Sequence, residues 1–276
     1  MILVTGATGF LGATLTHQLV EHGNNVRILR RETSKLDLLE DIVTHVDHAI
    51  GDVTDPLSLA DAMEGASQVY HTAAIVGFGG RKTRQQLHET NVQGTANVAN
   101  AALENDVERL VHVSSIAALG RREKEAGLID ETREWLSSKA NTAYAVSKHL
   151  AEMEIHRAIA EGLDAVIANP AVVFGPGRSG ENTMAIAEKL KAGKLPATPS
   201  GGTCVADVED VANGLRLAME HGHTDERYIL GGENLTWVEI LDTLADAMGT
   251  KRPKRVLSRR PALAVATVFE LITTLT

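Results

Sequence analysis

Tyr144 and Lys148 are the residues whose types and spacing most directly allow proton transfer. They lie four residues apart at the start of an expected helix, so the phenol and the ammonium share one face, one turn apart. A tyrosine that exchanges a proton near neutral pH needs its phenolate stabilised by about two to three pKa units, or about 3–4 kcal/mol, and a neighbouring positive charge provides this. Ser114 and Ser115 end an earlier apolar run, and the Ser115 hydroxyl can donate a hydrogen bond to a substrate oxygen. The combination predicts acid–base chemistry at an oxygen atom.

Three glycines near the N-terminus form a second pattern. Gly6, Gly9 and Gly12 follow the apolar run of residues 2–5, which predicts a strand, a tight turn and the start of a helix. Gly6 allows the turn, Gly9 lets the backbone approach a pyrophosphate, and Gly12 lets the helix pack closely on the strand. The N–H groups at the start of that helix then face the phosphates, so the chain is expected to bind a dinucleotide.

Apolar, β-branched runs alternate with helical patterns, which predicts an α/β fold with a doubly wound parallel sheet. The expected strands span residues 2–5, 25–29, 45–51, 68–72, 109–114, 165–169 and 228–231. The expected helices span residues 10–22, 56–64, 81–104, 143–161, 181–193, 208–221 and 236–248, with Asp55, Pro56 and Thr236 as helix-starting signals. Residues 1–172 are expected to form a dinucleotide-binding domain, and residues 173–276 a small α/β substrate lobe from which a strand and a helix return to the main domain.

Composition excludes several classes of function. The chain has 276 residues and a formal net charge of -9, which disfavours nucleic acid or an anionic membrane surface as a partner. Its single cysteine, Cys204, excludes an intramolecular disulfide, and the 11 histidines are scattered, so no metal site is expected. The N-terminus lacks a signal-peptide pattern, and the apolar stretch Ala262–Thr276 is too short to span a bilayer. We expect a cytoplasmic protein whose natural chain extends past Thr276.

Eight short motifs occur in an order that is typical of one enzyme family. They are Thr5–Gly12 (TGATGFLG), Gly51–Asp55 (GDVTD), His71–Ala74 (HTAA), Asn91–Thr95 (NVQGT), Val113–Ser115 (VSS), Tyr144 with Lys148, Pro170–Pro176 (PAVVFGP) and Val205–Asp210 (VADVED). With these motifs the chain resembles the extended short-chain dehydrogenase/reductases, the NAD-dependent epimerase/dehydratase family. Its pattern is most similar to the dihydroflavonol-reductase and 3β-hydroxysteroid-dehydrogenase branch. The resemblance implies a Rossmann-type fold.

The resemblance also implies roles for individual residues. Tyr144 is expected to be the catalytic acid/base, Lys148 to lower its pKa and hold the nicotinamide ribose, and Ser115 to polarise the substrate. Asp52 and Val53 are expected to contact the adenine. The other expected cofactor contacts, besides Tyr144 and Lys148, are Gly6, Thr8, Gly9, Phe10, Leu11, Gly12, Thr72, Ala73, Ala74, Asn91, Ser114, Pro170, Val172 and Val173.

Two arginines bear on the choice between NAD and NADP. An acidic residue at the end of the second strand would bind the ribose hydroxyls of NAD, and Arg30 occupies that place. A guanidinium pairs bidentately with a 2′-phosphate, and Arg31 and Lys35 can assist. We therefore expect NADP(H) as the preferred cofactor. NAD(H) is the alternative, because a small backbone shift would bring the Glu32 carboxylate to the ribose.

Three functions compete within this resemblance. A dehydratase would carry an extra acid–base pair where this chain has Ile116 and Ala117, so dehydration is disfavoured. The stretch 168–176 matches the nucleotide-sugar epimerases only in part. The leading hypothesis is reversible hydride transfer between NADP(H) and a carbonyl or secondary alcohol. The alternatives are a nucleotide-sugar epimerase with tightly held NAD and a non-catalytic regulator that binds a dinucleotide.

The expected substrate pocket is mostly apolar, which favours a small, moderately hydrophobic ligand. Its expected lining includes Val76, Phe78, Ile116 and Leu136. The helices at 81–104 and 143–161 correspond to the surfaces through which the family dimerises, so a homodimer is expected.

Overall fold

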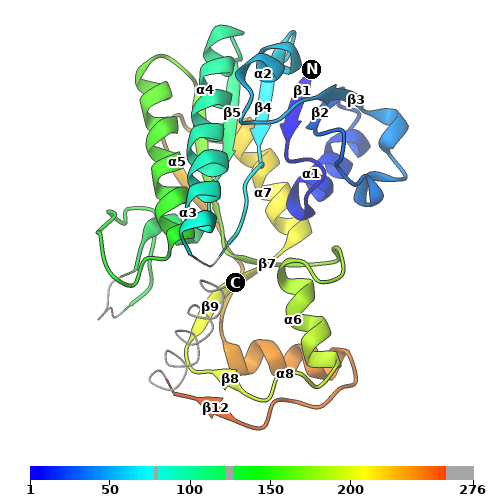
Figure 1. The fold of residues 1–276 in the computed structure, drawn as a ribbon, viewed down its shortest axis with the longest axis vertical. Coiled ribbons are helices and arrows are strands. Elements are labelled where there is room, and N and C mark those ends of the chain that lie inside the picture. The colour runs from blue at the N-terminus through cyan, green and yellow to red at the C-terminus, as the bar shows by residue number, and fades with distance from the viewer. Residues whose placement is uncertain (78–79, 122–126, 259–276) are drawn as a thin grey trace. The chain divides into compact units, whose positions relative to one another are not determined.

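A sheet of seven parallel strands, in the order β10-β6-β5-β4-β1-β2-β3, is the main element of the computed structural model (Figure 1). The structure describes residues 1–77, 80–121 and 127–258. The strands of this sheet are β1 (Ile2–Thr5), β2 (Val26–Arg30), β3 (Asp47–Ile50), β4 (Gln68–His71), β5 (Arg109–Val113), β6 (Ala165–Pro170) and β10 (Arg227–Leu230). The predicted doubly wound, Rossmann-type α/β fold is confirmed.

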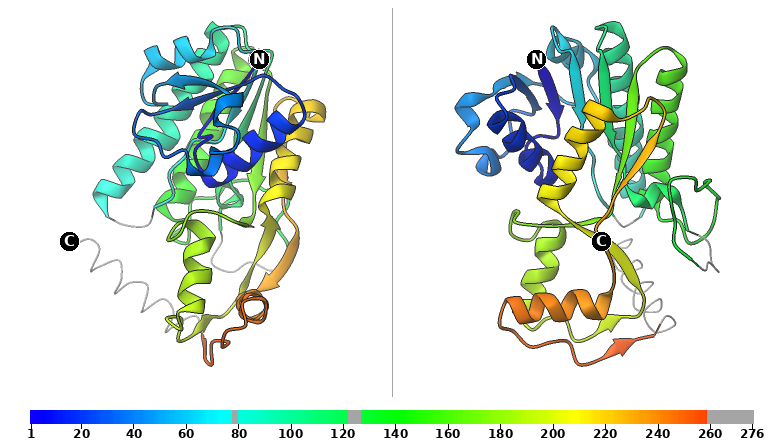
Figure 2. Two further views of the ribbon diagram at one scale, coloured as in Figure 1. Left: turned by 90° about the vertical axis from the view of Figure 1, so that its right-hand side faces the viewer. Right: turned by 180° about the vertical axis from the view of Figure 1, so that it is seen from behind.

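Helices cover both faces of this sheet (Figure 2). Successive strand residues point to opposite faces, so the neighbours Leu3 and Val4 belong to two different clusters of buried side chains. On the Val4 side the cluster includes residues of α1 (Phe10–Glu21) and α7 (Val208–His221). On the Leu3 side it includes residues of α2 (Pro56–Met63), α4 (Gly94–Glu104) and α5 (Ala143–Ala160). Burial on both faces explains the continuous apolar runs of the strands.

The parallel register places the carboxyl ends of the strands at one edge of the sheet. Thr5, the last residue of β1, lies opposite Leu29 of β2 and His71 of β4. In the same way His71 lies opposite His112 of β5, and Val113 lies opposite Ala168 of β6. The segments that follow these strands therefore meet at this edge, where doubly wound sheets bind their ligands.

Two predicted helix starts are confirmed by their capping contacts. The Asp55 carboxylate accepts a hydrogen bond from Leu57 N at 3.1 Å, and Pro56 occupies the first turn of α2. Thr236 begins α8 (Trp237–Ala247) with a capping box: its hydroxyl accepts from Glu239 N, and the Glu239 carboxylate accepts from Thr236 N at 2.8 Å.

Residues 81–104, predicted as one helix, form three consecutive segments. These are α3 (Arg81–Leu87), a π-helical segment (His88–Gln93) and α4. The wider π turn contains the buried Asn91. Hydrophobic periodicity does not distinguish such a turn from an α-helix, so the sequence pattern predicted one continuous helix.

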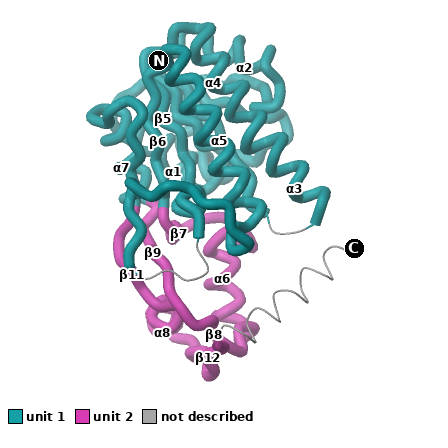
Figure 3. Tube along the Cα trace, turned by 90° about the vertical axis from the view of Figure 1, so that its left-hand side faces the viewer, with its two compact units in different colours: residues 1–170, 209–230 teal, residues 171–208, 231–276 magenta. Residues whose placement is uncertain are grey.

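The chain divides into two compact units, residues 1–170 with 209–230 and residues 171–208 with 231–276 (Figure 3). The second unit contains the sheet β11-β9-β7 and the strand pair β8–β12. Its elements are β7 (Val172–Phe174), α6 (Asn182–Lys191), β8 (Thr198–Pro199), β9 (Gly202–Asp207), β11 (Glu233–Thr236), α8 and β12 (Val256–Leu257). Leu190 of α6 packs with Leu241 and Ala245 of α8. The stretch Ala262–Thr276 lies outside the described residues, among which no helix is both long and apolar enough to cross a membrane.

Candidate active site

The turn between β1 and α1 accepts glycine alone at two of its positions. Gly6 has φ +73°, and a Cβ there would lie 2.6 Å from Ala73 N. A Cβ on Gly12 would overlap the carbonyl oxygen of Gly6. Gly9 N donates to Gly6 O at 2.9 Å, which closes the turn. The positive φ of Gly6 and the close packing at Gly12 agree with the turn and the close helix packing that the sequence pattern predicted, whereas the approach of Gly6 to Ala73 was not predicted.

The start of α1 is open to an anion. Gly9 caps the helix without a side chain, and the first turn contains no acidic residue. Thr8, Phe10 and Leu11 are each partly exposed. The first N–H groups of a helix lack intrahelical partners and lie at its positive end. This arrangement fits the pyrophosphate of a dinucleotide.

Arg30 and Arg31 lie at the end of β2, on the adjacent strand. Arg30 Nε donates to His48 Nδ1 at 2.8 Å, while His48 Nε2 lies 2.9 Å from Val43 O. A carbonyl only accepts, so Nε2 carries the proton and Nδ1 is free to accept from Arg30. Arg31 is exposed, with its guanidinium 4.0 Å from the Asp52 carboxylate. The Asp52 carboxylate also accepts from the backbone and hydroxyl of Thr54, whereas Val53 is buried in the core.

Asn91 holds the segment that follows β4. Its amide accepts from Ile75 N at 2.8 Å and donates to Ile75 O at 3.0 Å and to Ser147 Oγ at 3.0 Å. At the beginning of this segment the Thr72 hydroxyl donates to Thr5 O at 2.7 Å, which ties it to β1. Ala73 is half-buried and Ala74 is exposed. Asn91, one of the expected cofactor contacts, thus fixes the backbone of Ile75 next to the end of β4.

Ser115 and Tyr144 share a hydrogen bond between their side chains. Ser115 Oγ also accepts from Ala117 N at 3.2 Å, because Ser115 caps the 3-10 helix Ile116–Leu119. Tyr144 stands in the first turn of α5, whose cap Thr142 accepts from Ala145 N at 3.1 Å. Burial raises the pKa of Tyr144, and the hydrogen bond from Ser115 opposes that rise. Without a further positive charge, the tyrosine is therefore a proton donor.

Lys148 is buried one turn after Tyr144. Its side chain is 1% exposed, and Nζ donates to Val113 O at 2.8 Å. Burial lowers the pKa of Lys148 from 10.5 to about 8, while the charge of Glu152 opposes this. The structure therefore holds the Lys148 ammonium group against the backbone of β5, one helical turn after Tyr144.

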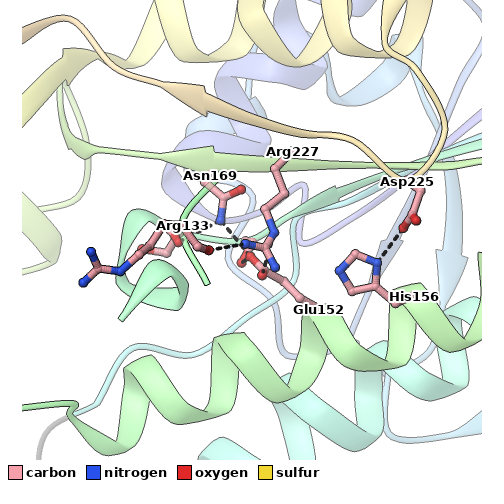
Figure 4. Close-up of polar contacts among 8 residues, drawn as sticks. Arg133, Glu152, His156, Asn169, Asp225 and Arg227 are labelled. Carbon is pink, nitrogen blue, oxygen red and sulfur yellow. Dashed lines mark hydrogen bonds and ion pairs between the residues drawn. The ribbon is translucent and has the colours of Figure 1, made fainter. Parts of the chain in front are cut away.

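Three polar residues that sequence reasoning missed lie next to this group (Figure 4). The buried carboxylate of Glu152 accepts from Ser114 Oγ at 2.5 Å and from Asn169 Nδ2 at 2.7 Å. Arg227 Nε lies 3.5 Å from its other oxygen. The Ser114 hydroxyl, expected near the cofactor, is thus bound to Glu152. The spacing of four residues between Lys148 and Glu152 was a signal in the sequence, because it puts both on one helical face.

The remaining predicted residues are distributed over both units. Pro170 ends β6 and is buried, while Val172 and Val173 lie in β7, opposite Val205 and Ala206 of β9. Of the expected pocket lining, Val76 and Leu136 are exposed and Ile116 is half-buried. Phe78 lies outside the described residues. Within those residues no three His, Cys, Asp or Glu side chains are grouped to hold a metal ion.

Comparison with known proteins identifies the family. The model of the NAD dependent epimerase/dehydratase family matches residues 2–231, and the chain belongs to this family. A Synechocystis sp. protein named as a dihydroflavonol 4-reductase is 35% identical over 98% of this chain and 78% of its own length. Sterol demethylase protein B of Methylococcus capsulatus is 34% identical over 96% of this chain and 79% of its own length.

A solved structure agrees with this assignment. The crystal structure of gox2253 has a TM-score of 0.87 and 35% sequence identity, covering 99% of this chain and 82% of that chain. The protein is therefore an NAD(P)-dependent oxidoreductase of the extended short-chain dehydrogenase/reductase type, and the resemblance stated from its motifs is confirmed.

Proposed function

We propose that the protein interconverts a carbonyl group and a secondary alcohol on a small, moderately hydrophobic substrate, with NADP(H) as cofactor. The observation that carries this proposal is the hydrogen-bonded pair Ser115–Tyr144, with the buried Lys148 one helical turn after Tyr144. Two hydroxyl groups within hydrogen-bond distance of each other can both donate to the oxygen of a ketone, whose negative charge increases as it is reduced.

The residues of the chain have separable roles in this reaction. When bound, the nicotinamide supplies or removes the hydride. Ser115 and Tyr144 donate hydrogen bonds to the carbonyl oxygen, and the Tyr144 hydroxyl gives its proton to the developing alkoxide. Burial raises the pKa of Tyr144, which keeps it protonated for reduction. In this proposal the Lys148 ammonium stabilises the phenolate that remains. In the oxidation direction the same groups act in reverse.

The turn Gly6–Gly12 and the first turn of α1 would hold the pyrophosphate, because Gly6, Gly9 and Gly12 carry no side chains and the first turn of α1 contains no acidic residue. Arg30 and Arg31 support the preference for NADP(H) over NAD(H). His48 holds Arg30 through Nε, and Nη1 lies 3.4 Å from Arg31 O, so the guanidinium keeps further N–H groups that can bond a partner such as a 2′-phosphate. The Asp52 carboxylate lies 4.0 Å from the Arg31 guanidinium and offsets its attraction for an anion, so Arg30 is the stronger candidate.

The substrate class is supported by two observations. Val76 and Leu136 expose apolar surface on the segments that follow β4 and precede α5. The names of two relatives, a dihydroflavonol reductase and a sterol demethylase protein, refer to ring compounds with large apolar surfaces. We therefore propose a cyclic, mostly apolar ketone or alcohol.

A homodimer is the proposed assembly. Val146, Leu150 and Met153 of α5 are exposed at spacings of four and three residues, so they form one apolar stripe. A groove of about 370 Å³, lined by Val92, Val146 and Leu150 among others, lies beside this stripe. Light scattering of the purified protein and of a Leu150→Glu variant measures the molar mass of each. A dimer that the substitution dissociates supports the proposal.

A panel of cyclic ketones and aldehydes, offered with NADPH or NADH beside nucleotide sugars, tests the activity. We expect NADPH oxidation with a cyclic ketone. Tyr144→Phe should lower kcat by about a hundred-fold or more while cofactor affinity stays near that of the wild type. Tyr228→Phe is the matched control, because the Tyr228 hydroxyl accepts from the backbone N–H of His223 and has no part in the proposed reaction. Conversion of nucleotide sugars without net cofactor oxidation would instead identify an epimerase.

A further inference from the structure

Helix α5 contacts the end of β5 with three side chains from one face. Tyr144, Lys148 and Glu152 are spaced at four residues, so each lies one turn after the last. Tyr144 bonds the Ser115 side chain, Lys148 donates to Val113 O, and Glu152 accepts from Ser114 Oγ. The helix thus holds three consecutive residues of the strand end.

The Glu152 contact is fully buried. Its side chain is 0% exposed, and one carboxylate oxygen accepts from both Ser114 and Asn169. The other oxygen lies 3.5 Å from Arg227 Nε, whose side chain is 20% exposed (Figure 4). A buried carboxylate destabilises the fold unless it is paired and hydrogen-bonded. Here Ser114 and Asn169 donate hydrogen bonds to it, and Arg227 provides the opposite charge.

Asn169 connects this carboxylate to the backbone of Ser115. Its Nδ2 has two hydrogens, and the nitrogen lies 2.7 Å from Glu152 Oε1 and 3.0 Å from Ser115 O. The Ser115 carbonyl is therefore held from β6, while the Ser115 hydroxyl bonds Tyr144 on α5. Loss of the Glu152 acceptor would release both Asn169 and the hydroxyl of Ser114.

Arg227 extends the network to the segment that precedes α5. Its Nη1 donates to Arg133 O at 3.2 Å, and the neighbouring Ile229 N donates to the Glu131 carboxylate at 2.9 Å. Trp135 of the same segment stacks on His149 of α5, with ring centroids 4.2 Å apart. One arginine of the edge strand thus contacts both the buried carboxylate and the segment before the catalytic helix.

We propose that Glu152, with Arg227 as its counter-ion, is a positioning residue that fixes Ser115 and keeps Lys148 charged for turnover. This inference rests on the proposed function, in which Ser115 and Lys148 act with Tyr144. Glu152 itself acts through these neighbours and is not assigned a contact with substrate.

The charge of Glu152 matters because Lys148 is buried. Burial lowers the pKa of Lys148 to about 8, and the Glu152 carboxylate opposes that fall. The charge of Lys148 also helps to lower the pKa values of His71 of β4 and His112 of β5. Burial lowers the pKa of His71 to about 3, and that of His112 well below its usual value, so both are neutral near pH 7. Neutralising Glu152 should therefore lower the pKa of Lys148 below about 8.

Two variants separate the charge from the hydrogen bonds. Glu152→Gln keeps the size and an acceptor oxygen but removes the charge, and Asn169→Ala releases the Ser115 carbonyl but leaves the charge. We expect Glu152→Gln to lower kcat by roughly ten- to a hundred-fold with the KM for NADPH within about two-fold. Asn169→Ala should lower kcat several-fold. Glu154→Gln is the matched control on the same helix, because Glu154 pairs with Arg157 instead.

A titration of Lys148 provides a readout that needs no turnover. In protein labelled with ¹³C-lysine, the Lys148 signal is assigned by its loss in Lys148→Met. We expect its midpoint to fall in Glu152→Gln and to stay near the wild-type value in Asn169→Ala and Glu154→Gln. An unmoved midpoint, or an unchanged kcat in Glu152→Gln, overturns the proposal. If the wild type reduces no carbonyl, the proposed function fails, and the titration alone still decides the role of Glu152.

Discussion

Replacing Lys148 by methionine should remove activity and stabilise the fold at neutral pH. The pKa of Lys148 falls from 10.5 to about 8, a difference of about 2.5 units, so keeping the lysine charged costs the folded state about 3 kcal/mol near pH 7. Methionine avoids this cost but leaves the Val113 carbonyl, now bonded by Nζ at 2.8 Å, without its donor. An unsatisfied buried carbonyl costs about 1–3 kcal/mol. The net gain for Lys148→Met is then about 1 kcal/mol near pH 7.

The sign of the pH dependence follows from linkage. The pKa of Lys148 in the folded state lies below its unfolded value, so the unfolded chain binds more protons between about pH 8 and about pH 10.5. The wild type therefore gains stability as the pH rises through this window, whereas Lys148→Met does not. Between about pH 7 and about pH 9.5 the advantage of the variant should fall by about 2 kcal/mol and reverse its sign.

Urea unfolding followed by tryptophan fluorescence measures this difference. The chain has two tryptophans, and Trp135 stacks on His149 of α5. In a Trp237→Phe background Trp135 reports the unit that contains Lys148. Lys139→Met, at an exposed position, is the control and should shift stability little at any pH. A stability gap between Lys148→Met and wild type that is independent of pH would refute the reasoning about the buried charge.

Two further substitutions test other parts of the first unit. Arg30→Ser should weaken NADPH binding by about ten- to a hundred-fold and NADH binding much less, measured by fluorescence titration; equal losses would argue against a 2′-phosphate contact. His112→Leu should raise the free energy of unfolding by about 1–2 kcal/mol, since both ring nitrogens are buried without a hydrogen-bond partner among the described residues. Calorimetry measures this, and a lower melting temperature would indicate an overlooked role for the ring.

The main sheet was predictable because its signals are local. Residues 2–5, 68–72 and 165–169 were predicted as strands, and each matches an observed strand within one residue. A strand that is buried on both faces is a continuous apolar run, so it can be recognised without knowing which strands pair with it. The strands β9 and β11 are different, since they are mostly half-buried or exposed and contain Gly202, Thr203 and Asn234. They form because β9 pairs with both β7 and β11. Such long-range pairing is not visible as a hydrophobic pattern in the sequence of either strand.

In the candidate site, the positions that depend on local spacing were predictable, and the contacts that depend on long-range packing were not. Spacing placed Tyr144 and Lys148 on one helical face and Ser115 at the strand edge, where the structure has them. The acceptor of Lys148 was not predictable, because Val113 O is a backbone atom brought near only by the packing of α5 on β5. Arg227 likewise reaches Glu152 only because β10 pairs with β6. Side-chain partners that come from edge strands depend on the order of the sheet.

The distribution of buried polar groups gives an independent reason to place function at this edge. Thr5, His71, His112 and Asn169 are buried, and each is the last or next-to-last residue of one of the neighbouring strands β1, β4, β5 and β6. Thr5 and His71 bond each other at 2.8 Å, but both nitrogens of His112 and the Asn169 Oδ1 lack partners among the described residues. Buried polar groups reduce stability unless they are paired. A fold selected for stability alone would place apolar residues there, as along the rest of these strands. The concentration of buried polar groups at the carboxyl edge therefore supports the proposal that the active site lies there.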